Sequence, residues 1–264
     1  PREAFVKWLT DEKNPYFAKI AVNRIWHWIF GAGITNPADD LRPNKISSNP
    51  KLEKYLEDVF VKSGYDLKAV FKEIFLSDAY SRSSRTNPSN TNDDTLFSRH
   101  IPARLDAESL NDIISGIFGV YQPFKSITPE PYAFWPEDFK AIQLHDGSVS
   151  NPFLTLFGKP GRNSSHLNDR SNKLSMQQIL HLLGSSNINS KLDKSQFLKD
   201  LAKQPIPPHK KITTLYLTFL TRFPTQKELD VSKKYLEENA KTTYEGLKDI
   251  AWALINTKEF LFKL

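Results

Sequence analysis

Helical periodicity is the feature that most limits the folds open to this chain. In the segment that follows Pro50, apolar side chains recur at the spacing that lines one face of a helix. The same spacing returns along much of the chain, and the alternation of apolar and polar residues typical of strands is nowhere sustained. The sequence therefore predicts an all-α fold, with helices near residues 15–30, 50–63, 66–77, 106–118, 175–183, 211–221, 225–239 and 243–256.

Capping signals support several of these helix starts. Ser175 with Gln178, and Thr225 with Glu228, have the spacing of a capping box, in which each side chain satisfies a free backbone N–H. Asp106 is expected to cap the helix that begins beside it. These signals predict where helices begin more sharply than periodicity does.

The stretch from Gly119 to Leu174 breaks the pattern. Prolines interrupt it repeatedly, and aromatic residues lie between them. We therefore expect an irregular, Pro- and aromatic-rich insertion at residues 119–174, between helical parts at 1–118 and 175–264, with all three in one compact domain. An irregular segment of this length inside a compact domain usually has a function.

Composition excludes several classes of chemistry. The 264 residues include no cysteine, which rules out disulfides, thiolate nucleophiles, iron–sulfur clusters and covalently attached haem. No metal site and no cofactor are predicted. The net charge is +6, but Lys and Arg are scattered among acids, so a nucleic-acid partner is not expected. No apolar run is long enough to span a membrane, and the start at Pro1-Arg2-Glu3 suggests a piece of a longer protein.

Two groups of residues in the N-terminal half can be interpreted functionally or structurally. Trp26, His27 and Trp28 would form an aromatic platform for a sugar or another flat ligand if exposed. The structural alternative, which we favour, buries the tryptophans and pairs Arg24 with Asp39 or Asp40.

The Arg104-Leu-Asp-Ala-Glu108 segment raises the same choice. Two carboxylates that act as a hydrolytic pair face each other across a cleft. Asp106 and Glu108 are two residues apart, and on a helix they point away from each other. We therefore expect Asp106 to be a cap, and Arg104 to be buried or half-buried in an ion pair with a carboxylate.

The end of the irregular insertion holds the strongest candidate ligand site. Arg162, His166, Asp169 and Arg170 cluster just before the helix expected near Ser175. Two arginines beside a helix start are suited to an anion such as a carboxylate, sulfate or phosphate group. The alternative, again the one we favour, is that these residues bond to one another and pin the loop to the helices.

An ordered series of short motifs resembles a known family. It runs through Asn14-Pro-x-Phe-Ala-Lys19, Asn23-Arg-x-Trp26, Phe30-Gly-x-Gly33, Ser77-x-x-Tyr80-x-Arg82, Arg104-Leu-Asp-Ala-Glu108, Arg222-x-Pro-Thr-x-x-Glu228-Leu229 and Asn256-x-x-Glu259-Phe260. The chain resembles domain of unknown function 1553, the planctomycete cytochrome-associated family, over essentially its whole length. Many relatives carry Cys-x-Cys where this chain has His166 and Asn168, which removes any thiol role from it.

The resemblance implies a context but no activity. It implies the C-terminal part of a large exported bacterial protein, in the periplasm or at the cell surface, with a c-type cytochrome domain elsewhere in that protein. The leading expectation is a non-catalytic binding or scaffold module with an anionic or carbohydrate ligand. The alternatives are a hydrolase of carbohydrate or another polymer, with its site in the insertion, and a docking domain for the cytochrome domain.

Overall fold

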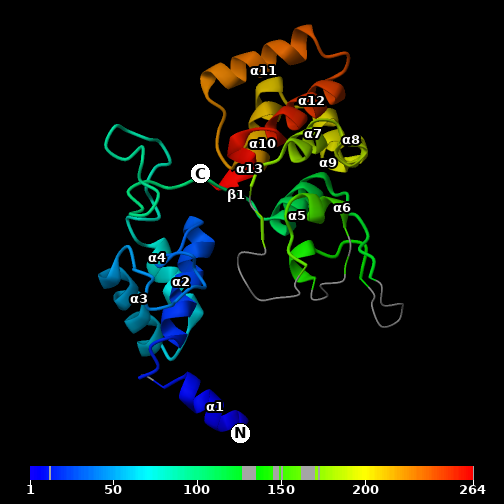
Figure 1. Cartoon of the computed structure of the whole chain (residues 1–264). Helices are drawn as coiled ribbons and strands as arrows, with labels where there is room; N and C mark the ends of the chain where they lie inside the picture. The colour runs from blue at the N-terminus through cyan, green and yellow to red at the C-terminus, as the bar shows by residue number, and fades with distance from the viewer. Residues whose placement is uncertain are drawn as a thin grey trace. The chain divides into compact units, whose positions relative to one another are not determined.

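The computed structural model of the chain describes residues 1–11, 13–126, 135–144, 149, 151–161, 170–171 and 173–263. It divides into two compact units, Pro1–Ala103 and Arg104–Lys263. Apart from two strands of two residues each, the regular structure in these ranges is helical (Figure 1). The predicted all-α fold class is confirmed.

The N-terminal unit is a small helical cluster. α2 packs against α3 and α4 and supplies two large aromatic residues of the core, Trp26 and Phe30, whose ring centroids lie 4.3 Å apart. α1 buries none of its residues. The four helices are α1 (Arg2–Leu9), α2 (Phe17–Phe30), α3 (Pro50–Lys62) and α4 (Leu67–Phe75).

The C-terminal unit is larger and has one continuous apolar core. α5 packs against α6, α8 and α9, and α12 packs against α8 to α11. Its elements are β1 (Ala103–Arg104, whose first residue belongs to the N-terminal unit), α5 (Ala107–Phe118), the 3₁₀ helix η1 (Ala141–Gln143), α6 (Pro152–Leu156), α7 (Met176–Gly184), α8 (Ser186–Lys194), α9 (Gln196–Lys203), α10 (Pro208–Leu220), α11 (Gln226–Glu238), α12 (Thr243–Ile255), α13 (Lys258–Leu261) and β2 (Phe262–Lys263).

A short ladder joins the two ends of this unit. β1 pairs with β2, and the N–H of Leu105 donates to the carbonyl of Leu261 at 2.9 Å. The first and last segments of the C-terminal unit therefore lie side by side.

The division of the chain differs from the expected one. The boundary falls at Ala103–Arg104 and not after residue 118, because α5 contributes its apolar face, including Leu110 and Ile114, to the core of the C-terminal unit. The expected single compact domain is two compact units.

The sequence patterns also missed five short α-helices, α1, α6, α8, α9 and α13. α6 lies inside the expected irregular insertion, where the side chain of Asn151 caps a helix that Pro152 begins. α8 and α9 are capped by Ser185 and Ser195. Helices of four to nine residues are too short to show a long apolar periodicity.

Asn23 ties the middle of α2 to the loop that follows this helix. Its side chain is fully buried and makes three hydrogen bonds: Nδ2 donates to the carbonyls of Thr35 (2.7 Å) and Ala38 (2.9 Å), and Oδ1 accepts from the N–H of Thr35 (3.1 Å). Gly33 lies against it so closely that an added Cβ would sit 2.8 Å from Oδ1. The Asn23 side chain therefore supplies hydrogen-bond partners to backbone groups of a loop that forms no strand pairing.

We expect Asn23→Ala to lower the free energy of unfolding of the N-terminal unit by roughly 2–4 kcal/mol, because it leaves several buried backbone groups without partners. Urea denaturation followed by circular dichroism measures the change. Asn44→Ala, at an exposed loop position, is the matched control and should have little effect. Equal stability of the two variants would contradict this role for Asn23.

Candidate functional site

Of the two tryptophans that we expected to be buried, the structure buries Trp26 and exposes Trp28. Trp26 is 2% exposed, and its ring packs against Phe30 and Phe97 in the core of the N-terminal unit. His27 is half-buried, whereas Trp28 is exposed. Trp26 cannot contact a ligand from this position, so the platform reading of Trp26 and His27 is not supported by the fold.

Arg24 and the two aspartates form two separate groups. Nε of Arg24 donates to Oδ1 of Asp39 at 2.6 Å, and both side chains are partly buried. Asp40, the other expected partner, instead pairs with Arg42 at 2.7 Å and with Lys45 at 3.6 Å. The hydrogen bond from Arg42 holds the pKa of the Asp40 carboxyl well below its usual range. The Arg24–Asp39 pair therefore joins α2 to the loop that follows it, and the pairs of Asp40 lie within that loop.

Arg104 is buried, as expected, but its partners differ from the expected carboxylates. Its guanidinium donates to the carbonyl oxygens of Phe157 (2.6 Å), Ser171 (2.9 Å) and Leu105 (3.0 Å). It also lies over the ring of Phe157, 5.5 Å from the centroid. Burial lowers the pKa of Arg104. The carbonyl groups of Phe157 and Ser171 lie outside any helix, and Arg104 supplies a hydrogen-bond donor to each of them.

Glu108 binds Arg170 in place of Arg104. The Arg170 guanidinium holds the carboxylate in two hydrogen bonds, of 2.6 Å and 3.0 Å, and lies 3.7 Å from Asp106. Asp106 occupies the N-cap position of α5, but its side chain makes no capping hydrogen bond there. The Glu108 side chain is only 5% exposed, so this is a largely desolvated bidentate pair.

Close backbone packing completes this arrangement. Gly158 has φ of +84°, and a Cβ added to it would lie 2.0 Å from the carbonyl oxygen of Ser171. Only glycine fits at this approach. Of the four residues expected to form a ligand site, Arg162, His166 and Asp169 lie outside the described residues, and Arg170 serves as the anchor that pins its segment to α5.

We expect Arg170→Ala to lower the free energy of unfolding by about 1–3 kcal/mol, because the buried Glu108 carboxylate loses its bidentate partner. Thermal and urea unfolding measure this loss. The control is Lys173→Ala, an exposed cation three residues away, which should change little. An unchanged stability combined with loss of sulfate or phosphate binding would instead support the anion-site hypothesis.

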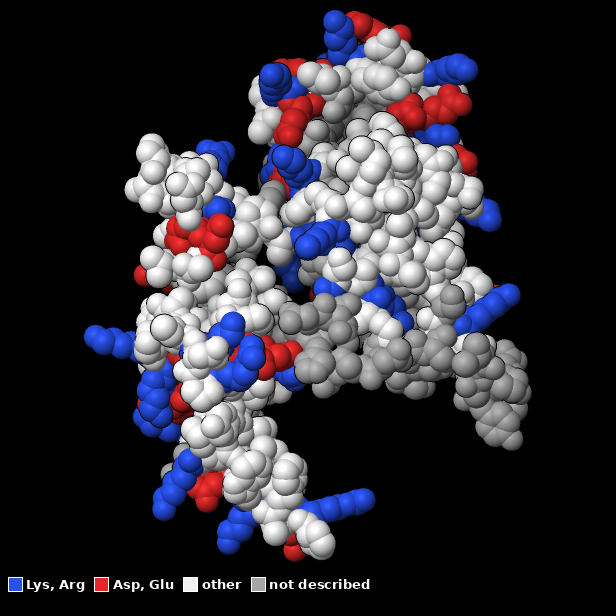
Figure 2. Space-filling view, in the orientation of Figure 1, with Lys and Arg blue, Asp and Glu red and all other residues white. Residues whose placement is uncertain are grey.

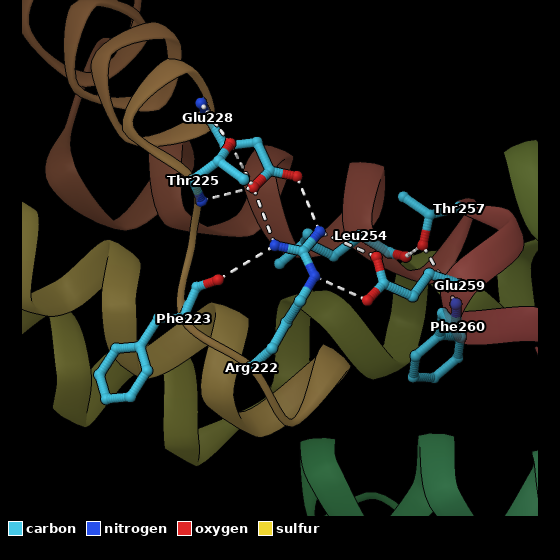
Figure 3. Close-up of polar contacts among 8 residues, drawn as sticks. All are labelled: Arg222, Phe223, Thr225, Glu228, Leu254, Thr257, Glu259 and Phe260. Carbon is cyan, nitrogen blue, oxygen red and sulfur yellow. Dashed lines mark hydrogen bonds and ion pairs between the residues drawn. The ribbon is translucent and has the colours of Figure 1, made fainter. Parts of the chain in front are cut away.

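A second arginine joins three helix ends in the C-terminal unit. Arg222 follows α10 and holds Glu228, in the first turn of α11, and Glu259, in the first turn of α13, with two hydrogen bonds to each (Figure 3). The four distances lie between 2.6 and 2.9 Å. Both carboxylates lie at helix N-termini, where the backbone N–H groups also favour negative charge.

The capping box of α11 is built into the same cluster. The side chain of Glu228 accepts from the N–H of Thr225 at 2.7 Å, and the Thr225 hydroxyl accepts from the N–H of Glu228 (Figure 3). Both predicted capping boxes, at Ser175 and Thr225, are confirmed. Hydrogen bonds from Arg222 and Thr225 lower the pKa of the Glu228 carboxyl from 4.5 to about 2.

This lowered pKa predicts an acid-sensitive unit. A carboxylate with a depressed pKa in the folded state adds stability above its unfolded value, and this contribution is lost as the pH falls from about 4.5 towards 2. We expect wild type to lose stability over this range and Arg222→Ala to lose less stability, since the variant lacks the ion pair.

At neutral pH the Arg222→Ala variant should be less stable than wild type by about 1–2 kcal/mol, a value reduced for partial exposure. Urea unfolding at stepped pH tests both, with the exposed Lys227→Ala as control; parallel pH profiles for wild type and Arg222→Ala would contradict the assignment.

Lys191 is a buried charge that the sequence analysis did not single out. It is 3% exposed, and its ammonium donates to the Ser115 hydroxyl (2.8 Å) and to the carbonyl of Val120 (2.6 Å) at the end of α5. Burial lowers its pKa to about 8. The signal was present, because Lys191 lies on the α8 stripe that also holds Ile188 and Leu192.

These clusters share one chemical character. Their carboxylates and cations are engaged with each other or with backbone groups across segments distant in sequence. Within the described ranges, no group of three or more His, Asp or Glu side chains is arranged to hold a metal ion. None of the described helices is long and apolar enough to cross a membrane.

The class defined by this fold is a helical module whose segments are fastened by arginine-centred polar clusters. The model of the family described as PSD1, protein of unknown function (DUF1553), matches residues 1–236, and the chain belongs to that family. No curated protein and no solved structure matches it.

Proposed function

We propose that the chain is a non-catalytic binding or scaffold module of an exported multidomain protein of the cell envelope. The observation that carries the binding role is an apolar stripe on α7, which we define as Met176, Ile179, Leu180 and Leu183. These side chains are 66%, 42%, 60% and 41% exposed, and they follow the i, i+3, i+4, i+7 spacing of one helix face. A contiguous exposed apolar face of this kind marks an interaction surface.

The opposite face of α7 is firmly anchored. Leu182 is buried in the core, and Nε2 of Gln178 donates to the carbonyl of Leu156 at 2.9 Å. The capping box at Ser175 fixes the start of the helix. The apolar stripe therefore lies on a helix whose position is already fixed by the fold. Because little further ordering is needed, the entropy cost of binding a partner is lower.

The chemistry of the stripe indicates the kind of partner. α7 contains no Asp, Glu, Lys or Arg, and the middle of the C-terminal unit, where Figure 1 labels α7, is largely free of charge in Figure 2. Elsewhere on the face drawn, Lys and Arg lie among Asp and Glu over the N-terminal unit and the upper part of the C-terminal unit, and with few acids in the lower part of the C-terminal unit (Figure 2). The absence of charge from α7 itself favours an apolar groove on another protein domain as the partner of the stripe. A domain of the same parent protein, including a c-type cytochrome domain, would supply such a groove.

The polar clusters favour binding over hydrolysis. A general acid that acts near neutral pH needs a raised pKa, whereas Arg222 lowers the pKa of Glu228. Glu108 and Glu259 are likewise held by arginines. The export and cell-envelope parts of the proposal follow from the family resemblance alone.

Hydrogen–deuterium exchange tests the docking role of α7. We expect the amides of α7 to be more protected in the longer parent protein than in the isolated chain, because a partner domain covers the stripe. The double variant Met176→Gln, Leu180→Asn should abolish the added protection with little change in the stability of the isolated chain, since both side chains are exposed.

The control is Ile46→Asn, a change at a side chain that is 87% exposed and lies in the other unit. It should leave the protection of α7 as in wild type. Identical exchange of α7 in the parent protein and in the isolated chain would overturn the proposed docking role.

A further inference from the structure

A pocket in the N-terminal unit is used by none of the interactions described above. Its volume is about 380 Å³, and it is lined by the end of α1, by residues 11 and 13–15, by the first turn of α2, by one face of α3 and by Tyr65. This volume suits a small molecule or one unit of a larger ligand.

One wall of the pocket is aromatic. The rings of Phe17 and Tyr65 both line it, with centroids 5.5 Å apart. Tyr65 adopts a left-handed backbone conformation, with φ of +65°, which is unusual for a residue with a side chain. Its ring also packs edge-on against Phe60, and its hydroxyl donates to the carbonyl of Thr10. The ring is therefore held in place on both its apolar and its polar side.

A carboxyl group in the wall has unused hydrogen-bonding capacity. The Glu57 side chain is 19% exposed, and its nearest cation, Nζ of Lys54, is 3.9 Å away, beyond hydrogen-bond distance. Lys54 lies closer to Asp58, at 2.9 Å. In the described part of the chain, the Glu57 carboxyl accepts no hydrogen bond, and burial raises its pKa. A carboxyl group that lines a pocket and accepts no hydrogen bond from the described residues can accept one from a ligand.

The charges around the pocket do not single out an anion. Lys19 pairs with the buried Glu53 at 3.2 Å, and Lys54 pairs with Asp58, so both ammonium groups that flank Glu57 already have acidic partners. Asp11 and Lys13, which also line the pocket, have opposite charges. The wall thus offers a hydrogen-bond acceptor at Glu57, the ammonium donors of Lys19 and Lys54, and the aromatic rings of Phe17 and Tyr65.

This combination matches the chemistry of a hydroxylated ring. A sugar ring presents hydroxyl groups that both donate and accept hydrogen bonds, and an apolar C–H face that packs on an aromatic side chain. We propose that this pocket binds one neutral hexose unit, with its hydroxyl groups on Glu57 and Lys54 and its C–H face against Tyr65 and Phe17. The proposal is independent of the docking role of α7, which concerns the other unit.

Isothermal titration calorimetry of the chain with neutral trisaccharides tests the proposal. The probes are cellotriose, maltotriose, xylotriose as a pentose comparison, and the trimer of N-acetylglucosamine. We expect saturable 1:1 binding of at least one hexose trimer, weakened tenfold or more by Glu57→Ala. Glu57→Gln, which keeps the shape and one acceptor, should weaken it less than Glu57→Ala does.

The titration has two controls. Glu73→Ala removes a carboxylate from α4 that does not line the pocket, and it should leave sugar binding unchanged. Trigalacturonate and inorganic sulfate form the anionic arm. Binding of the anions alone, binding of xylotriose alone, equal sugar binding by Glu57→Ala and wild type, or no binding of any trimer would each overturn the proposal.

Discussion

The buried guanidinium of Arg104 is the interaction on which the C-terminal unit depends. It satisfies three backbone carbonyls that no helix or ladder satisfies, and two of them belong to residues 53 and 67 positions further along the chain. Without these hydrogen bonds, the three carbonyl groups and the guanidinium charge of Arg104 would be buried without partners. The Arg170–Glu108 pair also fixes the segment that contains Ser171 to α5. Residues 157–158 and 170–171 are thus held by side chains in addition to the backbone hydrogen bond from the N–H of Ser171 to the carbonyl of Gly158 (3.3 Å).

The same device appears at the other end of this unit, which gives the family motifs a physical meaning. Arg222, Glu228 and Glu259 come from two motifs that are far apart in sequence, yet they meet at one junction of α10, α11 and α13 (Figure 3). Asn23 plays a similar part in the N-terminal unit. The motif residues in these clusters therefore connect elements of the fold and do not form one contiguous site.

The features that sequence could predict are those set by neighbouring residues. The long helices and the capping boxes at Ser175 and Thr225 follow from local spacing, and the structure confirms them. The partners of Arg104 and Arg170 do not, because a carbonyl or carboxylate more than fifty residues away leaves no trace near the arginine. The placement of α5 in the C-terminal unit was missed for the same reason. The pocket beside Glu57 was missed because its walls come from residues 9–65, and only the fold assembles them.

The pairing of β1 with β2 has a consequence for how the C-terminal unit can be joined to other domains. Its chain enters and leaves at the same place, since Leu105 and Leu261 are hydrogen-bonded to each other. A unit with adjacent ends can be inserted into a loop of another domain at little cost in chain entropy. Tension applied through its two ends would load this short ladder first and leave the helical core unstrained until the ladder opened.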